Sequence, residues 1–141
     1  MAKNNNLERI EQSIQESESK NISFSFEFYD ISDENKYCLS QWNKEQISLA
    51  LLRLRDINKK TYNEISRDSK VYHFYPVDWN KTTKKQGFSD VKLKNLSAFH
   101  FSLLGINNQK ARVFGAYSQN IFYIVWFDLN HEIWPSFKKH T

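Results

Sequence analysis

Three histidines lie in or beside segments that we predict to be strands, and each has aromatic neighbours. They are His73, His100 and His131. With a pKa of about 6.5, an imidazole can act as a base or as an acid near neutral pH. Cleavage of an RNA phosphodiester without a metal needs a base near the 2′-hydroxyl, an acid near the departing 5′-oxygen and a cation against the growing charge of the phosphorane. Histidine, arginine, lysine and tyrosine suffice for these tasks, so convergence of the three histidines would create a site.

The same residues also allow an ordinary structural interpretation. A single histidine in an aromatic strand is more often half-buried and hydrogen-bonded than catalytic. An arginine such as Arg112, at the start of a predicted strand, is often only a surface or sheet-edge residue. For His140, at the end of the chain, we expect no role.

Other chemistries lack the residue spacing that they need. The sequence has no HxxxH, HExxH or paired-cysteine motif, so we expect no metal site, although Cys38, Asp78 and the three histidines could in principle converge. It contains only 3 Gly and neither GxxxxGKS/T nor GxGxxG, which excludes the P-loop and Rossmann classes. We therefore expect no cofactor.

The single cysteine and the hydropathy pattern indicate a cytoplasmic protein. Cys38 cannot form an internal disulfide, and we interpret it as a small buried side chain in a reducing compartment. No apolar run approaches the roughly 20 residues of a membrane span. The first 20 residues also lack the apolar core of a secretion signal.

Positive charge is concentrated in the middle of the chain. Residues 1–37 contain 8 Asp/Glu and 4 Lys/Arg (4 − 8 = −4), whereas residues 53–94 contain 11 Lys/Arg and 5 Asp/Glu (11 − 5 = +6). The densest part is a predicted loop with five lysines, Lys81, Lys84, Lys85, Lys92 and Lys94. Lysines attract phosphates, and the nearby Tyr75 and Trp79 could stack on unpaired bases. RNA binding over this loop is one prediction, and a merely solvated lysine-rich surface is the alternative.

Two periodicities predict the order of the elements. Residues 22–28 alternate apolar and polar, which predicts a strand. Residues 47–57 have apolar residues at helical spacing, with Ser40 as the expected N-cap, and a capping box at Thr61 predicts a second helix through about Asp68. Extended segments follow at 71–75, 98–104, 111–117, 121–127 and 133–135.

These elements define an α+β fold in which an N-terminal strand and a helical hairpin precede a small, mostly antiparallel, twisted sheet of four to five strands. The run 121–127 is apolar on both faces, so we expect a central strand, joined to its predecessor by a tight turn at Gln119-Asn120. Six residues, or their immediate alternates, are expected to share one core: Phe24, Phe26, Leu51, Leu54, Phe122 and Ile124.

The chain divides into three parts. Residues 1–20 are interpreted as a polar N-terminal arm or docking helix, because Leu7, Ile10 and Ile14 form only a thin apolar stripe. Residues 21–137 are predicted to be a single α+β domain. Residues 138–141 form a basic tail.

The element order, together with Phe99-His-Phe-Ser-Leu, Arg112-Val-Phe-Gly and Phe122-Tyr-Ile-Val-Trp-Phe, resembles the RelE/ParE-type toxin superfamily over residues 22–134. The resemblance implies a bacterial, metal-independent endoribonuclease that cuts mRNA on the ribosome and is neutralised by a cognate antitoxin protein. It also implies that Arg112, at the start of its strand, neutralises the scissile phosphate. His131, after the last long strand, is similar in placement to the general acid of some relatives.

One strand departs from the family pattern. Where many relatives have alternating lysines, this chain has Phe99-His100-Phe101-Ser102, so His100 is the only basic side chain there. His100 is then the candidate base or second phosphate contact, and Tyr123 is a further candidate if its hydroxyl lies on the same face. A non-catalytic module that binds nucleic acid or protein on the same fold remains the alternative.

Overall fold

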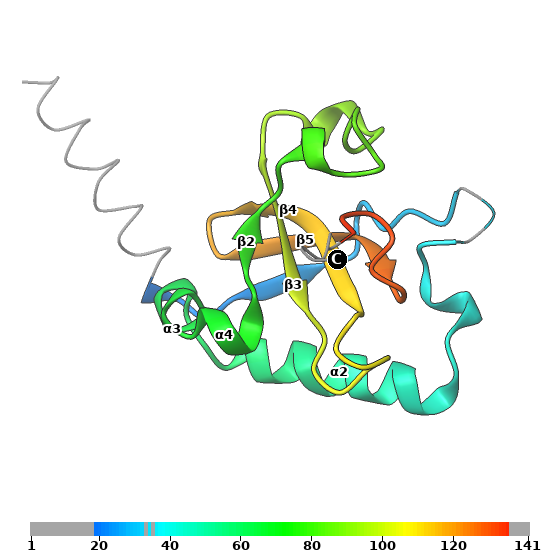
Figure 1. Ribbon diagram of the computed structural model, residues 1–141. Helices are drawn as coiled ribbons and strands as arrows, with labels where there is room; N and C mark the ends of the chain where they lie inside the picture. The colour runs from blue at the N-terminus through cyan, green and yellow to red at the C-terminus, as the bar shows by residue number, and fades with distance from the viewer. Residues whose placement is uncertain (1–18, 33, 35, 136–141) are drawn as a thin grey trace, which may run out of the picture.

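The computed structural model describes residues 19–135 except 33 and 35, and Figure 1 shows their arrangement as helices beside one sheet. Three α-helices are present among these residues: α2 (Lys44–Asn58), α3 (Tyr62–Arg67) and α4 (Ser69–Tyr72). The five strands are β1 (Ser23–Ser25), β2 (Tyr75–Pro76), β3 (Ser97–Ser102), β4 (Arg112–Ser118) and β5 (Ile121–Asp128). The α+β class predicted from the sequence is therefore confirmed.

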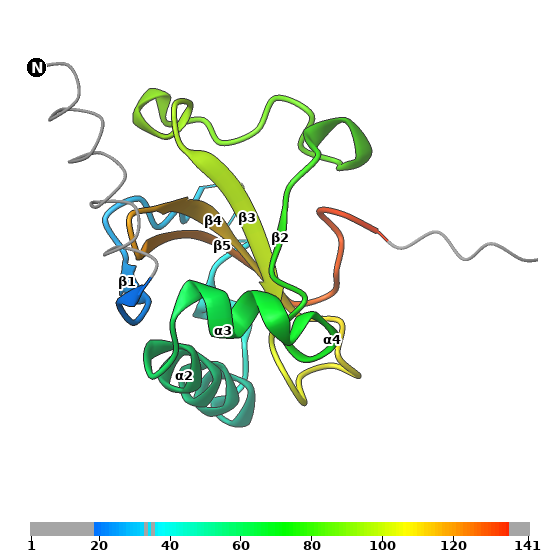
Figure 2. The ribbon, with the colours of Figure 1, turned by 90° about the vertical axis from the view of Figure 1, so that its left-hand side faces the viewer.

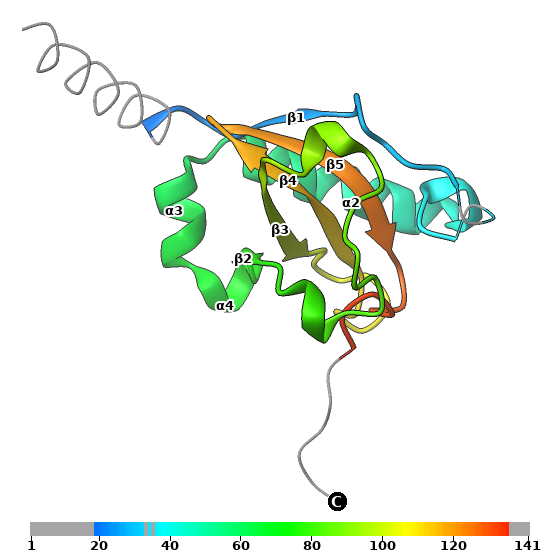
Figure 3. The same ribbon diagram turned by 90° about the horizontal axis from the view of Figure 1, so that it is seen from above.

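The sheet has the order β1-β5-β4-β3-β2. The β1–β5 pairing is parallel and the other three pairings are antiparallel. Figure 3 shows β1 at one edge and β2, with α4 beside it, at the other. The strand β5 lies between β1 and β4, which confirms the central position predicted from its two apolar faces. Gln119 and Asn120, both with positive φ, form the predicted turn before it.

Helices pack on one face of the sheet, and loops and irregular segments pack on the other. The helix face carries Val113, Phe122 and Ile124, which pack in one core with residues of α2, α3 and α4. The loop face carries Phe114, Ala116 and Val125, which pack against the 77–96 loop and other irregular segments. Figure 2 shows α2 and α3 on one side of the sheet and this loop on the other.

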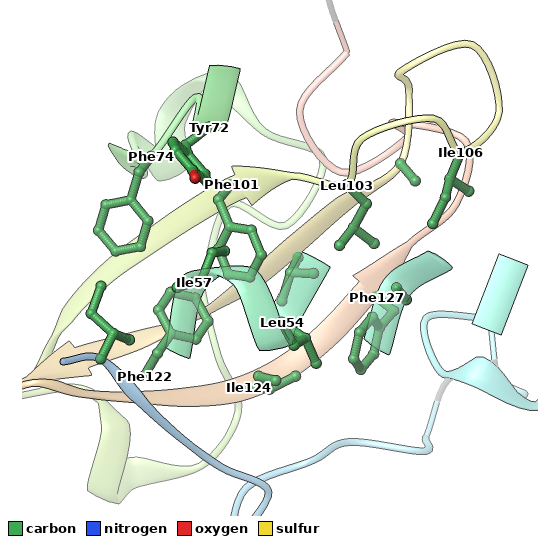
Figure 4. Close-up of a cluster of buried hydrophobic side chains, with 14 of the residues drawn as sticks. Leu54, Ile57, Tyr72, Phe74, Phe101, Leu103, Ile106, Phe122, Ile124 and Phe127 are labelled. Atoms are coloured by element: carbon green, nitrogen blue, oxygen red, sulfur yellow. The ribbon is translucent and has the colours of Figure 1, made fainter. Parts of the chain in front are cut away.

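The helix-face core contains Leu54 and Ile57 of α2 beside Phe122 and Ile124, as Figure 4 shows. Two of the six expected core residues are not there: the side chain of Phe26 is 52% exposed and that of Leu51 is 55% exposed. Phe26 leaves the strand alternation because the chain turns after Ser25, where the Tyr29 amide donates to the Phe26 carbonyl (3.1 Å). Leu51 is one residue away from the buried row of α2, which consists of Ala50, Arg53, Leu54 and Ile57.

Four predicted element boundaries are wrong. The strand predicted over 22–28 is only Ser23–Ser25. The N-cap of α2 is Asn43, which forms a capping box with Gln46, and not Ser40, which lies in a separate 3-10 turn. A strand was predicted over 71–75, but its first two residues belong to the helix α4. His73 ends this helix in the left-handed conformation, and only Tyr75–Pro76 is a strand. Residues 133–135 are not a strand. The capping box at Thr61 is confirmed.

The arm over residues 1–20 lies almost wholly outside the described residues, as does the tail over 138–141. Within the part of the chain that the structure describes, no helix combines the length and apolar character needed to cross a membrane.

Candidate functional site

The sheet register brings three segments to the same end of the sheet. Ser102 at the end of β3 pairs with Arg112 at the start of β4, and Arg112 pairs with Asp128 at the end of β5. His131 follows Asp128 by three residues, and His73 ends α4 just before β2. The histidines and Arg112 come from well-separated parts of the sequence, and the fold gathers them in one region, called here the His–Arg cluster (His73, His100, Arg112 and His131).

The charge of Arg112 acts on all three histidines of the cluster. Burial lowers the pKa of His100 to about 3, with further contributions from Arg112, His131 and His73. Burial likewise lowers the pKa of His131 to about 4, with Arg112 as the next cause. The pKa of His73 is also lowered, by burial first and then by Arg112. Near pH 7 in the free protein these imidazoles are neutral, so the fixed positive charge of the cluster is that of Arg112.

His100 is the most deeply buried histidine of the cluster. Its ring stacks on Phe114 (5.3 Å between centroids, 15°) and contacts Trp134 (5.0 Å). Only 8% of the residue is exposed, and its Nδ1 is buried with no hydrogen-bond partner among the described residues. An unpaired buried polar atom is costly and uncommon, and it often marks a functional position.

Arg112 is held by the loop that precedes it. Its Nη1 donates to the carbonyl oxygens of Gln109 and Ala111. Asn107, Asn108 and Gln109 all have positive φ, an unfavourable conformation for residues other than glycine. Burial lowers the pKa of Arg112 while Asp128 raises it, and the guanidinium stays charged.

The turn that carries His131 is fixed by hydrogen bonds. The buried Asp128 accepts from the amides of Glu132 (3.0 Å) and Ile133 (2.7 Å). Asn107 Nδ2 donates to the Leu129 carbonyl (2.9 Å) and to Asn130 Oδ1 (2.9 Å), which ties the Arg112 loop to the same turn. His131 itself has a φ of 58°. Asp128 and Asn107 are therefore positioning residues for Arg112 and His131.

Tyr123 lies apart from the His–Arg cluster. It pairs with Ala116, four residues along β4 from Arg112, a separation of roughly 13 Å at the usual rise of a strand. Its ring packs on Phe28 (5.6 Å). This position places the Tyr123 ring in the loop-face core and not beside the imidazoles.

The predicted RNA-binding residues differ in their exposure and in the contacts that their side chains make within the protein. Lys84 Nζ lies over the rings of Tyr37 (5.1 Å) and Trp126 (5.4 Å), and Lys85 Nζ donates to the Asn80 carbonyl (3.0 Å). The remaining three lysines, Lys81, Lys92 and Lys94, are exposed. Tyr75 is exposed on β2 and contacts the ring of His100 (6.2 Å), whereas Trp79 is half-buried against Phe88 (4.9 Å).

The sequence indicated some of these residues and not others. An aspartate that begins a turn, as Asp128 does at the end of β5, commonly accepts from the following amides, so the role of Asp128 had a local signal. No signal linked Trp134 to His100, because their contact joins residues 34 positions apart (134 − 100 = 34).

Among the described residues, no group of three or more His, Cys, Asp or Glu is arranged to hold a metal ion. Comparison of the chain with protein-family models, curated proteins and solved structures gives no match. Any functional proposal therefore depends on the residues of the site.

Proposed function

We propose that this protein is an endoribonuclease of the RelE type that cuts mRNA without a metal. The single observation that supports the proposal is the convergence of Arg112 with His100 and His131 at one end of the sheet, since a cation and two imidazoles are the groups this reaction needs. The substrate is mRNA, free or bound to the ribosome. A cognate antitoxin protein would hold the activity in check in the cytoplasm.

Each group has a role in the proposed reaction. Arg112 neutralises the scissile phosphate, His100 takes the proton of the 2′-hydroxyl or makes a second phosphate contact, and His131 protonates the departing 5′-oxygen. The low pKa of His100 keeps its imidazole neutral near pH 7 but makes it a weak proton acceptor, so the base role requires its pKa to rise when the negative phosphate binds beside Arg112. Trp134 covers His100, so contact of its imidazole with RNA requires that ring to move aside.

The acid role of His131 depends on the substrate. With a pKa of about 4, its imidazole carries almost no proton near pH 7 in the free protein. A bound phosphate offsets the charge of Arg112 and adds a negative charge beside the imidazole, and both effects raise its pKa. Protonation of His131 on RNA binding is therefore a necessary part of the proposal.

The fold gives limited support to the RelE-type assignment. A helical pair after the first strand, followed by three antiparallel strands with β5 in the interior, is the order on which the resemblance rests. The lysine pair found on the strand equivalent to β3 in many relatives is replaced here by the aromatic residues around His100.

Expression of the protein in cells tests the assignment: wild type should slow growth and leave cut messages.

Two variants make this test specific. His131→Ala and Arg112→Ala, with folding confirmed, should each relieve the toxicity. RNA affinity should stay largely intact in His131→Ala and weaken in Arg112→Ala, because only the arginine holds the phosphate in the ground state. If both variants stay as toxic as wild type, or if wild type is harmless and leaves messages uncut, the enzymatic proposal is wrong.

A second candidate is a non-catalytic module that binds nucleic acid or protein. The observation in its favour is that Arg112 Nη1 is already bonded to its own loop and that His100 is covered by aromatic rings. For an RNA-binding module, binding should persist without any cleavage in every variant. RNA binding that is unaccompanied by cut messages therefore distinguishes the two candidates.

A further inference from the structure

Two cavities lie between the 77–96 loop and its neighbours. One has a volume of about 320 Å³, and six of its lining residues matter here: Val77, Trp79, Gln86, Phe88, Lys94 and Leu96. The other has a volume of about 220 Å³ and lies by Glu27, Asp30 and Asp90. The larger one, called here the loop pocket, falls at the lower end of the usual range for small-molecule sites.

The chemistry of the two cavities differs in a way that selects the ligand. Three carboxylates line the smaller cavity, so it repels an anionic chain. The loop pocket has the aromatic rings of Trp79 and Phe88 with the amide of Gln86 and the ammonium of Lys94. An amide both donates and accepts hydrogen bonds, as the edge of a nucleobase requires, and aromatic walls favour a planar ring.

The position of the loop pocket relates it to the His–Arg cluster. Ala98 of β3 lines the pocket, and His100 lies two residues further on the same strand, so both side chains are on the loop face. From Ala98 to Ser102, the partner of Arg112, the strand rises by roughly 13 Å. A short single strand of RNA can therefore have its phosphate at Arg112 and a base at the pocket.

We propose that the loop pocket binds one unstacked base of the RNA, next to the site of cleavage. The inference rests on the proposed function and adds to it a site for base selection. Charge complementarity identifies RNA as the occupant, because the surrounding loop has five lysines over residues 81–94, with Asp90 as its only carboxylate. The rings hold the plane of the base, Gln86 hydrogen-bonds its edge and Lys94 contacts the adjoining phosphate.

Binding of mononucleotides tests the proposal without any cleavage. The probes are the four ribonucleoside 5′-monophosphates, with ribose 5-phosphate as the ligand that lacks a base. The signal is the indole N–H resonance of Trp79, assigned with Trp79→Phe. At least one mononucleotide should shift this resonance and bind about tenfold or more tightly than ribose 5-phosphate, because contact between a base and aromatic rings adds affinity.

The variants include a matched control. Gln86→Ala and Lys94→Ala should each weaken the preferred mononucleotide by about 3–10-fold. Lys44→Ala removes the same charge from an exposed residue of α2 that does not line the pocket, and it should change affinity by less than about twofold. These three positions are exposed, so the variants should fold.

The outcomes separate this proposal from the proposed function. Base-dependent binding that Gln86→Ala and Lys94→Ala weaken supports the pocket, even if messages are never cut. If no mononucleotide binds more tightly than ribose 5-phosphate, or if Lys44→Ala weakens binding as much as Lys94→Ala does, the pocket proposal is overturned while cleavage by the His–Arg cluster can still stand.

Discussion

At the scale of single residues, burial and the charge of Arg112 together keep the neighbouring histidines neutral near pH 7. This charge lowers the pKa of His73, His100 and His131 together, and in each case it is second only to burial. In the proposed function, where Arg112 receives the phosphate, the same side chain would also control when the imidazoles take up protons.

This coupling predicts the titration of His131. Arg112→Ala should raise the pKa of His131 from about 4 towards its ordinary value, because a neighbouring positive charge that disfavours the imidazolium is removed. Lys110→Ala is the matched control and should give a smaller rise, since Lys110 contributes less than Arg112. NMR titration of the imidazole Cε1–H resonances measures both pKa values. An unchanged pKa in Arg112→Ala would contradict the coupling.

The buried His100 predicts how stability depends on pH. Its pKa is about 3 in the folded protein, while an exposed imidazole has a pKa of about 6.5. Between these values the unfolded chain binds more protons, so the free energy of unfolding should fall as the pH drops from about 6.5 towards 3. His100→Phe, in which a ring still stacks on Phe114, should show a weaker fall. Urea denaturation at pH 7 and pH 4.5 measures the free energy of unfolding of both proteins. An equal fall in wild type and in His100→Phe would show that His100 does not cause it.

At the scale of elements, α2 presents one buried row to the sheet. Leu54→Ala should lower the free energy of unfolding by about 2–5 kcal/mol, because the side chain is packed in the helix-face core. Leu51→Ala, three residues earlier on the exposed side, should change it by less than about 0.5 kcal/mol. Chemical denaturation compares the two leucines directly. Similar losses would mean that Leu51 is covered.

An element could be predicted where a pattern among neighbouring residues determines it, and not where contacts between distant segments do. The strand β5 follows from a short continuous apolar run and the helix α3 from a capping box, and both are properties of neighbouring residues. In α2, Ala50, Leu54 and Ile57 are buried as their helical spacing predicts, whereas the apolar pattern did not indicate that Leu51 is exposed and Arg53 buried. Arg53 is buried since its guanidinium donates to the carbonyls of Ser102 (3.0 Å) and Val71 (2.6 Å), partners that only the fold supplies.

The candidate site likewise combines features that the sequence indicates with contacts that only the fold supplies. The chemistry of Arg112, His100 and His131 was visible in their residue types, and their approach follows from a register that no local pattern fixes. Tyr123 was a candidate because strand alternation allowed it to share a face with His100. The register, however, puts it well along β4 from Arg112. The contact of Trp134 with His100 depends on the path of the irregular C-terminal segment.

At the scale of the whole molecule, the distribution of lysines predicts the salt dependence of RNA binding. Replacing the exposed Lys81, Lys92 and Lys94 by alanine should reduce the slope of log affinity against log salt by about 2, since each phosphate contact contributes roughly −0.7. Replacing Lys44 of α2, Lys59 at its C-terminal end and Lys70 of α4, which are all exposed, should leave the slope unchanged. Equal slopes in the two triple variants would exclude the loop as the RNA surface.

The central claim is that Arg112 and His131 cut RNA through attack of the 2′-hydroxyl. The most direct test is the chemistry of the new ends after purified protein acts on mRNA, free or in ribosome complexes. Expulsion of the 5′-oxygen should leave 5′-hydroxyl ends, which accept a labelled phosphate without prior phosphatase treatment. Arg112→Ala and His131→Ala should lower the rate by about 10²-fold or more, while Lys110→Ala stays near wild type. Uncut RNA, 5′-phosphate ends, or equal rates in all variants would contradict the claim.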